Sequence, residues 1–263
     1  MLWALWIAAA GVPSLKILII FVLGTVLTRS AGCAINDYAD RHWDGKVTRT
    51  QNRPLATGDL TPTDALVTTA VLMLLAFVLV LFTNTLTIKL SFVAVFLAVL
   101  YPFTKRITHW PQLFLGLAFA WAVPMAFAAQ SNYVSASAWW LFAAAVIWAS
   151  AYDTLYAMVD REDDVKVGIK STAIFWGKYD LWFVGTAQTL MLLLVMLVGY
   201  LNGRGFLFLL GLCLAALMIA KQLHDCRFRD KDQCFKAFIN NHYIGMIIFI
   251  GIALDYLFFP VAH

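Results

Sequence analysis

Charged residues are scarce in this chain: Asp, Glu, Lys and Arg together make up only 13% of its 263 residues. Soluble globular domains carry about 25% charged residues. Hydrophobic residues fill the difference, at 62% of the chain, with ten Trp and twenty Phe among them. This composition excludes a soluble globular domain and places the bulk of the chain in lipid.

Cysteine and histidine are also few, and they are scattered. Cys33, Cys213, Cys226 and Cys234 form no CxxC pair, and the five histidines form neither HExxH nor any other ligand spacing. A zinc, haem or iron site therefore has no support in the sequence. No Pro/Ser/Gly-rich linker divides the chain, so residues 1–263 are expected to form a single membrane domain.

Apolar runs long enough for a bilayer core, roughly 20 residues with some shorter, occupy most of the chain. They predict an all-α polytopic membrane protein of about nine helices, near 2–10, 14–35, 62–82, 86–102, 111–128, 137–158, 180–201, 205–221 and 237–259. The first is too short to span. Because MLWALWIAAAG has no basic n-region and no cleavage site, it is interpreted as the second half of a truncated helix and not as a signal peptide.

The distribution of Lys and Arg predicts the orientation. The loops at 36–61, 103–110, 159–179 and 221–236 hold fifteen of the nineteen basic residues, whereas the intervening connections hold only Arg204. By the positive-inside rule the basic loops face the cytoplasm. The net charge of +4 is then a consequence of membrane topology, and no nucleic-acid partner is expected.

The acids are concentrated in two short stretches, the first of which is NDYADRHWD at 36–44. If the second apolar helix continues through this stretch, Asn36, Asp37, Asp40 and Asp44 fall within an arc of about 100°. A single-faced arrangement is not needed for solubility. Helix capping or solvation, which suffices for acids such as Asp59, explains this pattern poorly.

The second acidic stretch is YDTLYAMVDREDD at 152–164. On a helix Asp153, Asp160 and Asp164 fall within about 40°, with Tyr156 beside them and Glu162 on the opposite side. The two stretches also suggest a loose internal duplication. Two acid ridges at the cytoplasmic ends of two helices are expected to face each other.

Carboxylates stacked along one helix face repel one another, so a cation must offset their charge. Mg²⁺ is the natural candidate because it prefers oxygen ligands, keeps part of its water and binds substrate phosphates. The substrate would then carry a diphosphate. Basic residues on the same side could bind its remaining oxygens, although topology alone also accounts for each of them: Arg49, Arg53, Lys105, Arg106, Lys166 and Lys170.

These motifs resemble the UbiA family of membrane prenyltransferases, whose hallmarks are NDxxDxxxD and a second DxxxD motif. Here they correspond to residues 36–44 and 160–164, the latter preceded by Asp153. The resemblance extends along essentially the whole chain. The segments GCAINDYADRHWDGKVTRTQNRPL, YPFTKR, AYDTLYAMVDREDDVKVGIKSTA and CFKAFINNHYIG are similar to bacterial 4-hydroxybenzoate polyprenyltransferases of ubiquinone biosynthesis.

The resemblance implies a helical bundle around a central cavity, in the bacterial inner membrane, open toward the cytoplasm and laterally to lipid. The implied reaction is the Mg²⁺-dependent transfer of a polyprenyl group from polyprenyl diphosphate to 4-hydroxybenzoate, ortho to its hydroxyl. Family members carry a longer N-terminal part with a basic DKP-type segment, from which this chain departs.

The resemblance also assigns roles to residues. Metal binding is expected of Asn36, Asp40, Asp44, Asp160 and Asp164, and catalysis of Asp40, Asp44, Asp153, Asp160 and Asp164. Substrate binding is expected of Asn36, Arg49, Arg53, Tyr101, Lys105, Arg106, Tyr156, Lys166 and Lys170. Within this set, Tyr101 and Lys105 fit a YxxxK element over the diphosphate. Arg106 matches a position for the carboxylate of the aromatic acid.

Three alternatives stay open at this stage. Another aromatic acceptor, such as naphthoate, homogentisate or haem, would fit the same family. An ion-coupled transporter also places acids within its spans, but near the midplane and not at one face. A CDP-alcohol phosphotransferase also uses aspartates and Mg²⁺, but its DGxxAR…GxxxDxxxD pattern is not in this sequence.

Overall fold

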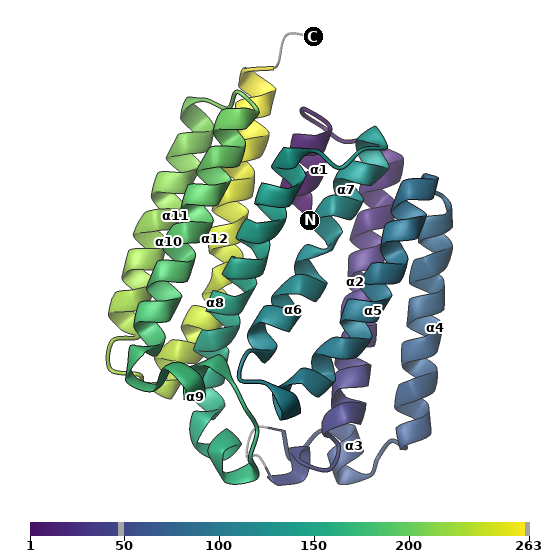
Figure 1. Cartoon of the computed structure of the whole chain (residues 1–263), viewed down its shortest axis with the longest axis vertical. Coiled ribbons are helices and arrows are strands. Elements are labelled where there is room, and N and C mark those ends of the chain that lie inside the picture. The colour runs from purple at the N-terminus through teal and green to yellow at the C-terminus, as the bar shows by residue number, and fades with distance from the viewer. Residues whose placement is uncertain (47–49, 261–263) are drawn as a thin grey trace.

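The computed structural model describes residues 1–46 and 50–260, and within these residues the regular structure is entirely helical (Figure 1). Eight helices in the described part are long and apolar enough to cross a membrane. Together with the short α1 (Leu2–Ala8), they confirm the expected all-α architecture of about nine helices. The chain is therefore an integral membrane protein.

The helices follow one another with short connections. After α1 come α2 (Leu15–Asp40), η1 (Asp44–Lys46), α3 (Pro54–Thr57), α4 (Pro62–Leu81), α5 (Thr85–Ile107), α6 (Pro111–Ala120), α7 (Ala122–Ser131), α8 (Ala136–Val167), α9 (Thr172–Trp176), η2 (Gly177–Tyr179), α10 (Asp180–Leu201), α11 (Phe206–Asp225) and α12 (Lys231–Phe258). One predicted span, 111–128, is divided into α6 and α7, which adjoin at Trp121.

Local capping sets the ends of the long helices. Thr61 and Asp64 form a capping box at the start of α4, and the Asn84 side chain accepts from the Thr87 backbone N–H at 2.9 Å at the start of α5. Helix α8 ends at Gly168, whose φ of 75° is a left-handed conformation that glycine adopts without strain.

The two acidic stretches fold differently. Helix α8 runs unbroken through the second stretch, as the sequence predicts. The first stretch does not continue as an α-helix to Asp44: α2 ends at Asp40, and the backbone N–H of Trp43 turns back to the Asp40 carbonyl at 2.7 Å. Asp44 instead belongs to the turn that follows, where it is buried and contacts Thr50 and Arg53 six and nine residues further on.

Helix α8 lies at the centre of the bundle, where it packs against α6, α10 and α12 (Figure 1). The close approach of α6 requires Gly116, because a Cβ there would lie 2.6 Å from the carbonyl oxygen of Val146. Helices α11 and α12 cross at Gly211 and Gly251 in the same manner. This packing fixes α8, and with it the acidic end of the helix, relative to α2 and α5.

Candidate functional site

A single pocket gathers most of the residues singled out by the sequence. It has a free volume of about 140 Å³ and lies at the end of the bundle where α2, α5 and α8 finish, the lower end in Figure 1. Eleven of the fourteen predicted site residues line it: Asn36, Asp40, Asp44, Arg53, Tyr101, Lys105, Asp153, Tyr156, Asp160, Asp164 and Lys170. The fold therefore brings both acidic stretches to one cavity.

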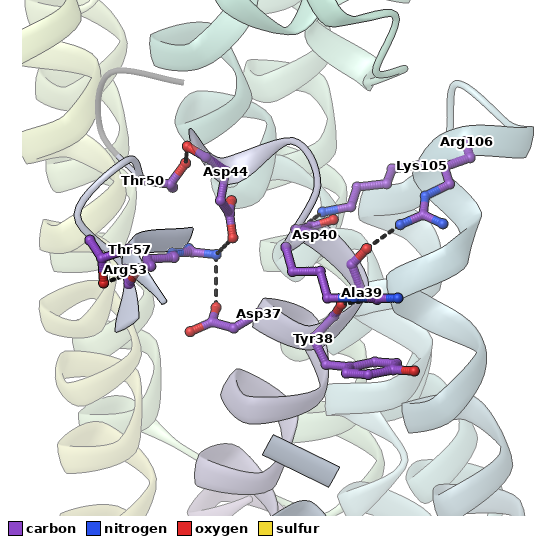
Figure 2. Close-up of polar contacts among 11 residues, drawn as sticks. Asp37, Tyr38, Ala39, Asp40, Asp44, Thr50, Arg53, Thr57, Lys105 and Arg106 are labelled. Atoms are coloured by element: carbon purple, nitrogen blue, oxygen red, sulfur yellow. Dashed lines mark hydrogen bonds and ion pairs between the residues drawn. The ribbon is translucent and has the colours of Figure 1, made fainter. Parts of the chain in front are cut away.

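Asp40 and Lys105 join the first acidic stretch to α5. The ammonium of Lys105 donates to the Asp40 carboxylate, whose side chain is only 8% exposed (Figure 2). Because Asp40 is the last residue of α2 and Lys105 lies in the last turn of α5, the pair holds the two helix ends together. It also places a half-buried cation at the wall of the pocket.

Arg53 bridges two other acids of the first stretch. Its Nη1 lies 2.7 Å from Asp37 Oδ1 and 3.1 Å from Asp44 Oδ2 (Figure 2). Burial raises the pKa of the Asp44 carboxyl above its ordinary value, and the Arg53 charge partly opposes this shift. The guanidinium charge thus offsets part of the cost of burying the Asp44 carboxylate.

The loop between α8 and α9 forms another wall. The backbone N–H of Lys170 donates to the Lys105 carbonyl at 3.0 Å, and its ammonium donates to the Ile107 carbonyl at 3.1 Å. The Gln112 side chain at the start of α6 accepts from the Thr172 backbone N–H at 3.0 Å. These contacts hold the loop against the end of α5 and the start of α6, with Lys170 in the pocket lining.

The second acidic stretch presents one face of α8 to the pocket. Asp153, Asp160 and Asp164 line it together with Tyr156, whose ring lies 4.7 Å from that of Phe238 on α12. Glu162 lies outside the lining and pairs with Lys231 at 2.7 Å. The face expected from helical periodicity is therefore the face that meets the cavity.

Three predicted residues do not line the pocket. Lys166 is 72% exposed and pairs with Asp163 at 3.0 Å, which corrects its expected place at the diphosphate. Arg106 donates to the Ala39 carbonyl (Figure 2). Its guanidinium carbon lies 4.1 Å from the Trp43 ring centroid. Of these two contacts, Trp43 is in the pocket lining. Arg49 lies outside the described residues.

The donor set of the pocket fits a hard divalent cation. The side-chain oxygen of Asn36 is buried in the pocket wall and has no hydrogen-bond partner among the described residues. Carboxylates of both acidic stretches line the same cavity. Within residues 1–46 and 50–260, however, no three His, Cys, Asp or Glu side chains are grouped as a preformed metal site. Oxygen donors shared with a phosphate ligand suit Mg²⁺, which rarely uses an all-protein cage.

Arg29 is a charged residue inside α2 that the sequence analysis did not single out, and it is exposed and lies outside the pocket lining. It lies seven residues before Asn36, two turns or about 10 Å deeper on the same face of α2. Its guanidinium lies 5.2 Å from the Phe119 ring centroid and close enough to Tyr101 and Tyr152 to interact electrostatically. The signal in the sequence was a charged residue inside a membrane span. Placing such a residue in the bilayer costs free energy, and residues of this kind usually have a function.

Comparisons with known proteins agree with this geometry. The model of the UbiA prenyltransferase family matches residues 1–249. The 4-hydroxybenzoate octaprenyltransferase of Nitrosococcus oceani is 55% identical over 256 residues, which cover 97% of this chain and 90% of that protein.

Solved structures share the fold. A UbiA homologue from Aeropyrum pernix K1, in its apo form, has a TM-score of 0.83 and 25% identity over 97% of both chains. A UbiA homologue from Archaeoglobus fulgidus, bound to GPP and Mg²⁺, has a TM-score of 0.65 and 17% identity, covering 99% of this chain and 94% of that one.

Proposed function

Because the chain belongs to the UbiA prenyltransferase family, we propose that it transfers a polyprenyl group from polyprenyl diphosphate to 4-hydroxybenzoate, for ubiquinone biosynthesis. The similarity to the N. oceani enzyme along nearly the whole chain carries this choice of substrates. We place the protein in the bacterial inner membrane with its pocket toward the cytoplasm, since the loops at that end hold most Lys and Arg.

The diphosphate is bound by the basic side chains around the pocket. Lys105, Lys170 and Arg53 come from three different segments and line the same cavity. When a diphosphate enters, their charge-assisted hydrogen bonds hold its oxygens and fix the direction of the bond to be broken. Each cation also stabilises negative charge as it grows on the leaving group.

Mg²⁺ is proposed as the cofactor. Asn36, Asp40 and Asp44 on one side and Asp160 and Asp164 on the other would hold it together with the diphosphate. When bound there, the ion neutralises the negative charge that develops as the diphosphate leaves. The unpartnered Asn36 oxygen is the observation in this chain that supports a cation at this place.

The aromatic acid is proposed to lie deeper, between the acids and Arg29. A carboxylate paired with Arg29 would set its ring about two helical turns or less from Asn36, beside Tyr101 and Phe119. Arg106, the residue suggested by the family resemblance, stays a second candidate. Its guanidinium already contacts Ala39 and Trp43, which favours Arg29.

The carbon–carbon bond then forms between the allylic carbon and the ring carbon ortho to the hydroxyl. Tyr101, Tyr156 and Trp43 line the cavity and can stabilise positive charge on the allylic group through their π faces. They also reduce access of water, which would capture that group as an alcohol. The ring proton passes to a nearby carboxylate, for which Asp153 and Asp160 are the candidates.

The location of the acids favours an enzyme over an ion-coupled transporter. They cluster at one end of the bundle beside basic residues, whereas coupling sites of transporters lie near the bilayer midplane.

The experiment is incubation of membranes containing the protein with Mg²⁺, 4-hydroxybenzoate and polyprenyl diphosphates of several lengths, followed by mass analysis of the lipid product. We expect 3-polyprenyl-4-hydroxybenzoate and diphosphate. Parallel reactions with naphthoate and homogentisate test the alternative acceptors. Absence of product with every diphosphate would contradict the proposal.

A further inference from the structure

A second concavity lies on the outer surface of the bundle, away from the pocket. It has a volume of about 590 Å³ and is lined only by residues of α10 and α11, among them Trp182, Gly185, Thr189, Leu193 and Leu223. These two helices lie side by side at the left of Figure 1. Gly185 and the threonines make the groove hollow, because their side chains are shorter than those around them.

The dimensions of this groove match one leaflet of a bilayer. From Leu181 at one end to Leu193 at the other, α10 rises by about 18 Å at 1.5 Å per residue. Half of a hydrocarbon core is about 15 Å thick. The groove therefore runs from the membrane surface to its midplane, the span of a single acyl chain.

Cationic side chains surround the end of the groove that lies at the membrane surface. Lys178 precedes α10, Lys221 lies in the last turns of α11, and Arg227 and Arg229 follow α11. Arg229 reaches over the start of α10, where it donates to the Lys178 carbonyl at 2.7 Å and pairs with Asp180. These cations thus lie where α10 begins and α11 ends, the two helices that line the groove.

The nearby acids do not cancel this charge. Asp180 is buried and pairs with both Arg161 and Arg229, and Asp225 pairs with Lys221 at 2.6 Å. Lys178 and Arg227 are exposed and lie against aromatic rings, and Arg227 also donates to the His224 carbonyl. Arg227 is close enough to Asp225 to interact electrostatically, but that carboxylate is already paired with Lys221. Asp230 and Asp232 belong to the start of α12, which contributes nothing to the groove.

Aromatic side chains mark the level of the membrane interface at the same place. Trp182 is 74% exposed at the mouth of the groove, and Tyr179 and Phe228 are also exposed. Trp and Tyr concentrate where hydrocarbon meets head groups. Clustered Lys and Arg at that level bind anionic head groups.

We propose that this groove is a binding site for an anionic phospholipid, with an acyl chain along α10 and α11 and the phosphate against Lys178 and Arg227. The inference is independent of the proposed enzymatic function, because neither the groove nor these cations touch the pocket.

The test uses the full-length protein purified in detergent, with native mass spectrometry to measure bound lipid and thermal unfolding to measure stabilisation. The probes are phosphatidylglycerol and phosphatidylcholine with identical acyl chains. We expect the wild type to retain phosphatidylglycerol preferentially. K178A/R227A should lose roughly 25-fold in phosphatidylglycerol affinity, since each surface cation contributes about 1 kcal/mol.

Three further variants separate the contribution of the groove from that of the charges. K16A/K89A removes the same amount of charge from the first turns of α2 and α5, which do not line the groove. This variant should keep the lipid preference. T189W fills the groove from an exposed position and should lose both lipids, whereas L214W on the exposed side of α11 outside the lining should not.

Three results would overturn the proposal. The first is equal retention of the two lipids by the wild type, and the second is an unchanged preference in K178A/R227A. The third is a wild-type dimer that T189W converts to a monomer, which would show that a second copy of the chain occupies the groove.

Discussion

The ammonium of Lys105 on α5 donates to the carboxylate of Asp40, the last residue of α2, across 65 positions of sequence. Both side chains line the pocket, so the contact that joins the helices also shapes the proposed diphosphate site. Structural and chemical roles of this pair can be separated by mutation.

Lys105→Ala should destabilise the protein by up to about 3 kcal/mol, because it leaves the buried Asp40 carboxylate without its cation. Turnover should also be lost. Adding Asp40→Asn removes the uncompensated charge, so thermal unfolding of the double variant should recover toward wild type while turnover stays absent. Recovery of turnover along with stability would contradict a direct role for the pair.

Asp44→Asn should separate stability from activity. Burial raises the pKa of this carboxyl, so the charged form is disfavoured at its site, and a neutral amide avoids that cost. Arg53 keeps Asp37 as a partner at 2.7 Å. We expect an unfolding temperature equal to or above that of the wild type, with turnover reduced at least about tenfold. A large fall in unfolding temperature would count against this account.

Asp160→Asn and Glu162→Gln form a matched pair on α8. Asp160 lines the pocket, whereas Glu162 points away and pairs with Lys231. The first variant should abolish Mg²⁺-dependent product formation, and the second should retain it within about twofold, because an exposed ion pair contributes little. Similar losses in both would indicate a general effect on α8.

Arg29→Ala should raise the KM for the aromatic acid by about tenfold or more, the cost of one charge-assisted hydrogen bond, with the KM for the diphosphate nearly unchanged. Arg106→Ala is the comparison. Through its contacts with Ala39 and Trp43, it should affect both substrates to a similar degree. If Arg106→Ala raised the KM for the aromatic acid selectively and Arg29→Ala did not, the carboxylate of the aromatic acid would be assigned to Arg106.

Removal of divalent metal should be visible without turnover. With a non-hydrolysable diphosphate analogue present, Mg²⁺ should raise the unfolding temperature, and chelation should reverse the increase. Asn36→Leu should diminish the shift, because it removes the unpartnered buried oxygen. An undiminished shift in Asn36→Leu would exclude this oxygen as a ligand.

Much of the fold and site was predictable because it depends on local properties. Hydropathy runs set the spans, and a periodicity of 3.6 residues set which acids of α8 share a face, since Asp153, Asp160 and Asp164 lie in one unbroken helix. The wrong expectation was a helix through Asp44, where contacts with Thr50 and Arg53 outweigh local helical preference.

The sequence by itself determined that the chain lies in a lipid bilayer, that it is helical, where the two acidic stretches are and which family it resembles. Composition, periodicity and short motifs are all properties of residues close together in the chain. Only the tertiary structure decided which charges meet. It paired Lys105 with Asp40, left Lys166 at the surface, turned Arg106 toward Ala39 and set Arg29 against the Phe119 ring. These outcomes depend on how α2, α5, α6 and α8 pack, and helix packing joins residues too far apart in the chain for local pattern to relate them.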